Sequence, residues 1–193
     1  MSVGRIEVIC GSMFSGKTEE LLRRLRRSEI AGQKHVLCKP VQDTRTNGGI
    51  ATHTGVEKEA LSILSGFQIL GVQDLEGIDI VAIDEAQFLD MVSVEVVQEL
   101  ADKGKRVIIA GLDMDYRARP FGPMPYFMAV AEKVTKLHAV CTVCGADACR
   151  TQRLAPGEGL VEIGGADKYD ARCREHFERP EESEERTQWT LSS

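Results

Sequence analysis

The sequence has few aromatic residues, no excess of positive charge and no long apolar run. Only 5% of its 193 residues are aromatic, and its formal net charge is −6. Proteins that bind DNA or RNA need cationic and stacking surfaces, so this composition argues against that class. No apolar run approaches the roughly 20 residues that span a bilayer, and the first residues lack the apolar core of a signal peptide. We therefore expect a cytoplasmic protein with no membrane or nucleic-acid partner.

An eight-residue motif near the N-terminus is typical of a phosphate-binding loop. The pattern G-x-x-x-x-G-K-[ST] is matched by Gly11, Ser12, Met13, Phe14, Ser15, Gly16, Lys17 and Thr18. A β-rich run at 5–10 precedes the motif and an amphipathic run at 18–31 follows it. The glycines let backbone N–H groups surround phosphate oxygens, and the helix N-terminus adds partial positive charge. With Lys17 on the outer phosphates and Thr18 on Mg²⁺, the chain is predicted to bind a nucleoside triphosphate.

Predicted strands and helices alternate through the first 140 residues. We expect a polar, mobile loop at 41–59, strands at 5–10, 35–39, 78–83, 106–112 and 135–140, and helices at 18–31, 92–103 and 125–134. This alternation predicts an α/β fold in which a parallel sheet is flanked by helices.

Four arginines on the first predicted helix could face either phosphates or solvent. Arg23, Arg24, Arg26 and Arg27 spread over much of the helix circumference. Because no single face collects them, we expect them to form a solvated surface.

An acidic pair follows the apolar run at 78–83. Ligands of nucleotide-binding α/β folds lie beyond the carboxyl ends of strands, so Asp84 is expected near Mg²⁺. Glu85 could deprotonate a nucleophile close to the γ-phosphate. That nucleophile could be water, as in an ATP hydrolase, or a substrate hydroxyl, as in a kinase. A non-enzymatic adaptor that uses ATP as a conformational switch is a third alternative.

The C-terminal quarter carries two pairs of metal-ligand residues. Cys141 and Cys144 form a C-x-x-C pair, and Cys173 and His176 form a C-x-x-H pair. Two such pairs complete a tetrahedral Zn²⁺ site without an open position, which predicts a structural metal. We expect a nucleotide-binding domain over 1–140, a zinc-anchored subdomain over 141–178 and an acidic, disordered tail over 179–193.

Together these segments resemble the type II thymidine kinases of many bacteria and of animal cytosol. The resemblance covers the chain from Gly4 to about His176 and is carried, besides the zinc ligands, by residues 11–18, 43–45, 84–88, 119–122 and 163–169. It implies a P-loop NTPase-type sheet with a small C-terminal zinc-binding lasso. It also implies transfer of the ATP γ-phosphate to the 5′-hydroxyl of thymidine, and more weakly of deoxyuridine, in nucleotide salvage. A homotetramer and feedback inhibition by thymidine triphosphate (dTTP) are further implications.

The resemblance also implies individual residue roles. Glu85 matches the general base, and Arg45 matches an arginine near the transferring phosphate, where Lys17 also acts. The implied ATP and Mg²⁺ contacts add Asp43, Asp84 and Gln87 to the phosphate loop. The implied nucleoside contacts are Met13, Phe88, Leu112, Tyr116, Phe121, Leu160, Val161, Glu162, Ile163, Gly164 and Tyr169. His176 stands where many relatives carry cysteine, which zinc tolerates.

Overall fold

The computed structural model describes residues 3–41, 49–51, 57–72, 75–154 and 167–180. Its helices are α1 (Lys17–Ile30), α2 (Phe67–Leu70), α3 (Ser93–Asp102) and α4 (Met124–Val130), with two short 3₁₀ helices, η1 (Leu75–Gly77) and η2 (Ala86–Phe88). Its strands are β1 (Arg5–Gly11), β2 (His35–Pro40), β3 (Gly49–Ala51), β4 (Glu57–Glu59), β5 (Leu61–Ile63), β6 (Ile80–Ile83), β7 (Arg106–Leu112), β8 (Lys133–Leu137), β9 (Ala139–Val140), β10 (Asp147–Ala148), β11 (Arg150–Arg153) and β12 (Tyr169–Arg172). Among the described helices, none is long and apolar enough to cross a membrane.

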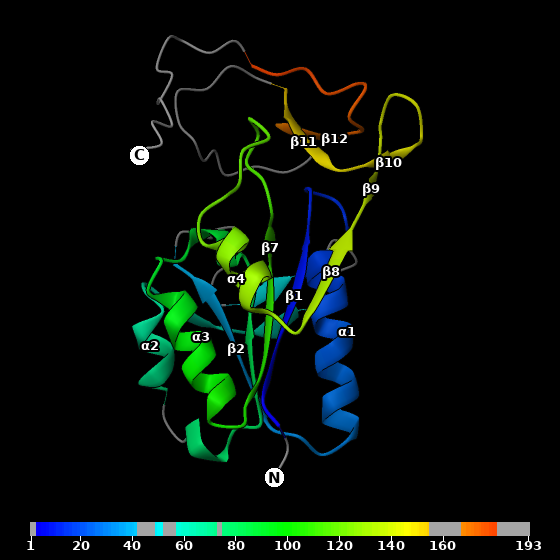
Figure 1. The fold of residues 1–193 in the computed structure, drawn as a ribbon. Coiled ribbons are helices and arrows are strands. Elements are labelled where there is room, and N and C mark those ends of the chain that lie inside the picture. Colours follow the sequence, from blue (N-terminus) through cyan, green and yellow to red (C-terminus); the bar gives the residue numbers. More distant parts are fainter. Residues whose placement is uncertain (1–2, 42–48, 52–56, 73–74, 155–166, 181–193) are drawn as a thin grey trace, which may run out of the picture.

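Six strands form one parallel sheet. Their order is β5-β2-β6-β7-β1-β8, and all five neighbouring pairs run in the same direction. α1 lies on one side of this sheet, while α3 and α4 lie on the other (Figure 1). Because helices cover both faces, the central strands are apolar on both sides, as the fully buried β6 shows. The predicted α/β fold with a parallel, helix-flanked sheet is confirmed.

The sheet separates two apolar layers. Val8 and Ile109 point into the layer that contains Leu100 of α3, whereas Ile9 and Ile108 point into the layer that contains Leu25 of α1. Neighbouring residues of one strand enter opposite layers because side chains alternate across a strand. This packing fixes where each strand ends, and therefore where the residues that follow β1, β6 and β7 are placed.

A small module built from β9 to β12 follows the sheet. β9 pairs with β10 and β11 pairs with β12, both antiparallel. Figure 1 shows β11 and β12 beyond the carboxyl ends of β1 and β7. The module has a separate core of small residues, Ala139, Cys141, Ala148, Ala171 and Cys173. The domain boundary expected at residue 141 stays a prediction.

Two sequence-based element boundaries are wrong. The helix predicted to reach residue 134 ends at Val130, and Lys133 and Val134 belong to β8. Pairing with β1 decides this, since Val134 lies opposite Val8 in a parallel ladder. The loop expected at 41–59 also contains β3 and β4, which pair antiparallel. Such non-local pairing is not visible in the local pattern.

Arg24 is buried, so the expectation of a fully solvated arginine surface is wrong at this position. Its side chain is 6% exposed, and its Nη1 lies 2.8 Å from Oε2 of Glu7 on β1. Its Nε lies 2.8 Å from Oε1 of Glu20. Arg106 binds both carboxylate oxygens of Glu7, at 2.8 and 3.0 Å. Burial alone would raise the pKa of Glu7, but the hydrogen bonds and charges of Arg106 and Arg5 outweigh it and lower the pKa to about 2.

Candidate active site

The phosphate loop is a tight turn between β1 and α1. Both of its glycines have positive φ, 148° at Gly11 and 82° at Gly16. A Cβ atom at Gly11 would lie 2.3 Å from the carbonyl oxygen of Leu137, so a side chain has no room there. Lys17 is 9% exposed, and its Nζ donates to the carbonyl of Ser12 at 2.7 Å. The ammonium group therefore lies inside the loop, where phosphate oxygens would gather.

Asp84 connects the phosphate loop to the end of β6. Its Oδ2 accepts a hydrogen bond from Oγ1 of Thr18 at 3.0 Å, and its Oδ1 accepts one from the backbone N–H of Glu85 at 3.0 Å. Burial, and then the nearby charge of Glu85, raise the pKa of Asp84 to about 7. A cation at this position would relieve both effects, and a hydroxyl beside a carboxylate is an oxygen donor set that Mg²⁺ accepts. The residues therefore fit Mg²⁺.

Glu85 occupies an unusual backbone conformation between β6 and η2. Its φ is 52° and its ψ is 37°, in the left-handed region that non-glycine residues rarely adopt. Nε2 of Gln87 donates to Oε2 of Glu85 at 2.5 Å, and the backbone N–H of Leu112 donates to Oε1 of Gln87 at 3.0 Å. Residues held in such conformations cluster at functional sites.

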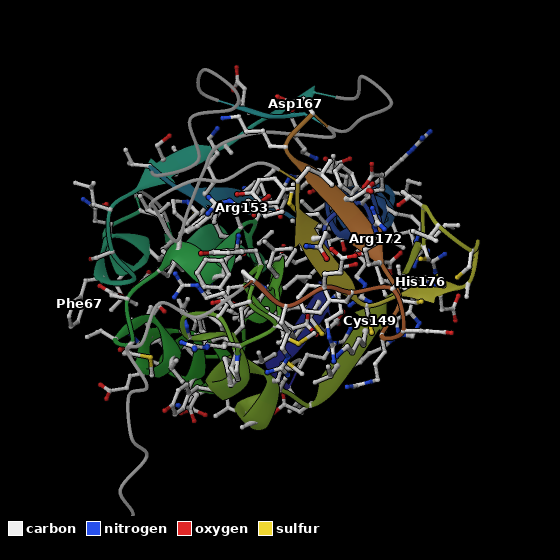
Figure 2. The ribbon with its side chains drawn as sticks, turned by 90° about the horizontal axis from the view of Figure 1, so that it is seen from above. Phe67, Cys149, Arg153, Asp167, Arg172 and His176 are labelled. Atoms are coloured by element: carbon white, nitrogen blue, oxygen red, sulfur yellow. The ribbon has the colours of Figure 1, made fainter. Side chains whose placement is uncertain are left out.

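Four of the expected nucleoside-contact residues lie in two aromatic groups. Phe88 and Phe121 pack edge to face, with ring centroids 5.6 Å apart and planes at 87°. Tyr116 and Tyr169 both lie near Arg153, whose Cζ is 4.4 Å from the first ring centroid and 5.9 Å from the second. Figure 2 shows Arg153 at the end of β11. No motif in the sequence marks Arg153, so its contacts with two tyrosines were not predicted.

Several expected site residues lie outside the described part of the chain. They are Asp43 and Arg45, expected near the phosphates, and Leu160, Val161, Glu162, Ile163 and Gly164, expected at the base.

The four expected zinc ligands come together in space. The ligand atoms of Cys141, Cys144, Cys173 and His176 all lie within 4.8 Å of one another. The Sγ atoms of Cys144 and Cys173 are 3.8 Å apart, and Sγ of Cys173 lies 3.2 Å from Nδ1 of His176. A tetrahedron with Zn–S bonds of about 2.3 Å has edges of about 3.8 Å, so the donor set fits zinc. Figure 2 shows His176 on the segment that follows β12.

The surroundings of Cys141 favour its thiolate form, which is the form that binds metal. Burial raises its pKa, but backbone hydrogen bonds from Cys173, Cys144 and Val143 outweigh burial and lower the pKa to about 6. Zinc binds the deprotonated form, so this preference favours metal binding at neutral pH.

The module of β9 to β12 touches the phosphate loop directly, a link that was not predicted. Oγ of Ser12 donates to the carbonyl of Ala148 at 3.3 Å, and the backbone N–H of Met13 donates to Oγ1 of Thr151 at 3.1 Å. Phe14, whose φ is 64°, packs against the core of the module. Three consecutive residues of the phosphate loop therefore depend on the segment that carries the zinc ligands.

A phosphate loop after the first strand and an acidic pair after β6, in a parallel sheet, define a P-loop protein of the α/β class. The family model for thymidine kinase matches residues 4–177. The chain therefore belongs to the thymidine kinase family, whose members are phosphotransferases.

Curated relatives that match this chain over most of their length are also thymidine kinases. A thymidine kinase of Rhodothermus sp. (strain ITI 518) is 56% identical over 93% of this chain and 84% of the relative. A thymidine kinase of Bdellovibrio bacteriovorus is 48% identical over 97% of this chain and 92% of the relative. Among solved structures, AMPPCP-bound DnaA from Aquifex aeolicus is 13% identical with a TM-score of 0.44, over 71% of this chain and 41% of that one.

Proposed function

We propose that this chain transfers the γ-phosphoryl group of ATP to the 5′-hydroxyl of thymidine, and less efficiently of deoxyuridine. The products are the nucleoside monophosphate and ADP, and the reaction serves nucleotide salvage. The observation that carries the proposal is the position of Glu85, which follows β6 directly after Asp84, the partner of Thr18 in the phosphate loop. A carboxylate there can act on a hydroxyl that lies close to the γ-phosphate.

The reaction needs a proton acceptor and positive charge around the transferring group. Glu85 would accept the proton of the 5′-hydroxyl. At the same time the 5′-oxygen would bond to the γ-phosphorus, and the bond from that phosphorus to the bridging oxygen of ADP would break. Lys17 would stabilise charge on the phosphate oxygens, and Arg45 is proposed to do the same from the segment after β2. Thr18 and Asp84 would hold Mg²⁺, which neutralises phosphate charge when bound.

The base would lie against apolar and aromatic side chains. Phe88 and Phe121 form one edge-to-face pair, Phe88 ends the 3₁₀ helix that follows Glu85, and Leu112 ends the neighbouring strand β7. Apolar surfaces of this kind suit a flat, methylated pyrimidine. Residues 160–164 are proposed to cover the base from the zinc-anchored lasso.

Resemblance to type II thymidine kinases supports three further proposals. We infer that the enzyme is a homotetramer, that dTTP inhibits it, and that it acts in the cytoplasm. Zinc is proposed to be structural, because four protein ligands leave no open position for substrate.

A coupled ADP-release assay with MgATP tests the reaction. ADP should form only when thymidine is present, more slowly with deoxyuridine, and not with deoxycytidine or deoxyadenosine. Equal release with and without nucleoside would mean that water is the acceptor, and the kinase proposal would be wrong.

Replacing the proposed base tests the mechanism. Glu85→Gln should reduce kcat by roughly 10²- to 10⁴-fold while ATP still binds, because a general base is lost. Glu95→Gln, on the exposed side of α3, is the matched control and should keep full activity. Full turnover in Glu85→Gln would contradict the assigned role.

A further inference from the structure

We propose that Gln87 is a positioning residue that holds the Glu85 carboxylate in the orientation needed to accept the substrate proton. This inference rests on the proposed function of Glu85. It gives Gln87 a role different from the contact with ATP or Mg²⁺ that the family resemblance implies.

The direction of the Gln87 amide is set by the backbone of β7. The N–H of Leu112 can only donate a hydrogen bond, and it lies 3.0 Å from the amide atom assigned as Oε1. The amide nitrogen must therefore face the other way, where Oε2 of Glu85 lies 2.5 Å from it. Gln87 is 2% exposed, so both ends of the amide are engaged inside the protein rather than towards a ligand.

Two glycines allow the backbone of neighbouring segments to approach Gln87 closely. A Cβ atom at Gly111 would lie 2.8 Å from Oε1 of Gln87 and 2.7 Å from Sδ of Met124. A Cβ atom at Gly122, which has a φ of 51°, would lie 2.1 Å from the carbonyl oxygen of Gln87. The side chain and the main chain of this residue are therefore both in close contact with glycine positions, one on β7 and one before α4.

Holding one carboxylate oxygen limits the motion of the whole group. The backbone of Glu85 has a left-handed conformation, and its N–H donates a hydrogen bond to Oδ1 of Asp84. Its side chain still has rotatable bonds, and the contact with Gln87 fixes the end of that side chain. Displacement of a catalytic group by about 1 Å can cost on the order of 10²-fold in rate, so such a contact matters to turnover.

Gln87→Met tests the proposal, because methionine has a similar length but makes neither hydrogen bond. We expect kcat for thymidine to fall by roughly 10- to 100-fold. The KM values for thymidine and ATP and the Mg²⁺ concentration for half-activity should each change by less than about threefold, since bound ligands are not contacted. Gln98→Met on α3, where the side chain is exposed, is the matched control and should have normal kcat.

A double-mutant cycle separates positioning from direct ligand contact. In a Glu85→Gln background, Gln87→Met should reduce the residual rate by less than about twofold, because the group that it positions is already lost. A further loss as large as that in the wild type, or a large change in the Mg²⁺ requirement, would overturn the proposal and favour direct contact.

A second variant keeps the test informative if Gln87→Met does not fold. Gly111→Ala leaves the amide in place but pushes on its oxygen, so kcat should fall several-fold with KM unchanged. Gly77→Ala is its control, because a Cβ atom there meets nothing within 4 Å. Normal kcat in a folded Gly111→Ala protein, or in a folded Gln87→Met protein, would show that Gln87 does not position Glu85. Failure of the proposed function would instead appear in the unsubstituted enzyme, as ADP release without nucleoside.

Discussion

Among the described residues, eighteen buried residues form the larger apolar layer of the parallel sheet, whereas five form the core of the β9–β12 module. The sheet layer contains large side chains such as Ile109 and Phe127, while the module core consists of alanine and cysteine only. Burial of side chains that small contributes little free energy. The Cys/His cluster that fits zinc belongs to the same module, and a structural zinc site can contribute roughly 10–16 kcal/mol of apparent binding energy. One chain can therefore stabilise its two regions by different means.

The two regions are nevertheless joined at the phosphate loop. Ser12 and Met13 form hydrogen bonds to the module, and Phe14 packs against its core. We therefore expect changes in the module to reach ATP binding as well as the nucleoside, although the phosphate loop belongs to the sheet.

Loss of zinc should have the largest effect, and the accompanying loss of folded structure should be confined to the module. Cys141→Ser removes a buried ligand, so bound zinc should fall from about one per chain towards zero. Amide hydrogen exchange should then lose protection in β9 to β12 while β1, β6 and β7 stay protected. Cys149→Ser, which is outside the ligand cluster, should retain zinc. Equal loss of protection in the sheet would contradict the separation of the two regions.

A cavity in the core of the sheet should have the opposite effect, because it should destabilise the sheet and leave the module unchanged. Ile109 is fully buried, and Ile109→Ala should lower the free energy of unfolding by about 2–5 kcal/mol, because it leaves a cavity. Zinc content should not change. Denaturant unfolding and metal analysis measure the two quantities, with Val134→Ala at a half-exposed position as the control. Release of zinc by Ile109→Ala would show that the module depends on the packing of the sheet.

The ion pairs of Glu7 should make the stability of the sheet depend on pH. The pKa of Glu7 is about 2 in the folded chain, compared with an ordinary 4.5. Because the pKa of Glu7 is lowered in the folded state, its ionised carboxylate stabilises the folded chain fully above pH 4.5. This contribution is lost as the pH falls towards 2. Glu7→Gln should therefore cost up to about 3 kcal/mol at pH 7 and progressively less below pH 4.5. Unfolding measured from pH 7 to pH 3 for both proteins tests this, and a constant difference would contradict it.

Removing the contact between the phosphate loop and the module should give the smallest effect. Phe14→Ala removes the ring that packs against the module core, and we expect ATP affinity to fall about five- to tenfold, which is about 1–1.4 kcal/mol. Zinc should remain bound. Binding of a fluorescent ATP analogue measures the affinity, and Phe67→Ala is the control because Phe67 is 60% exposed on α2 (Figure 2). Unchanged affinity would mean that the two regions act independently.

Local sequence was enough to predict much of this protein. The phosphate loop is one continuous motif, and strands β1, β2, β6 and β7 of the sheet are apolar or β-rich runs that can be recognised one at a time. The zinc ligands come as two close pairs, so their spacing predicted the cluster without knowledge of the fold. These features depend on residue type and short-range spacing, which the sequence displays directly.

Other features required the tertiary structure, because they join residues that are far apart in the chain. Arg24 is buried against Glu7, 17 residues away, although its helix position indicated solvent. The amide of Gln87 is oriented by Leu112, 25 residues away, and Thr151 reaches Met13 across 138 residues. Such contacts depend on which strands become neighbours and on which side chains then meet between them. Short-range spacing therefore defines the chemical groups of this protein, and the packing of distant segments decides which of those groups act together.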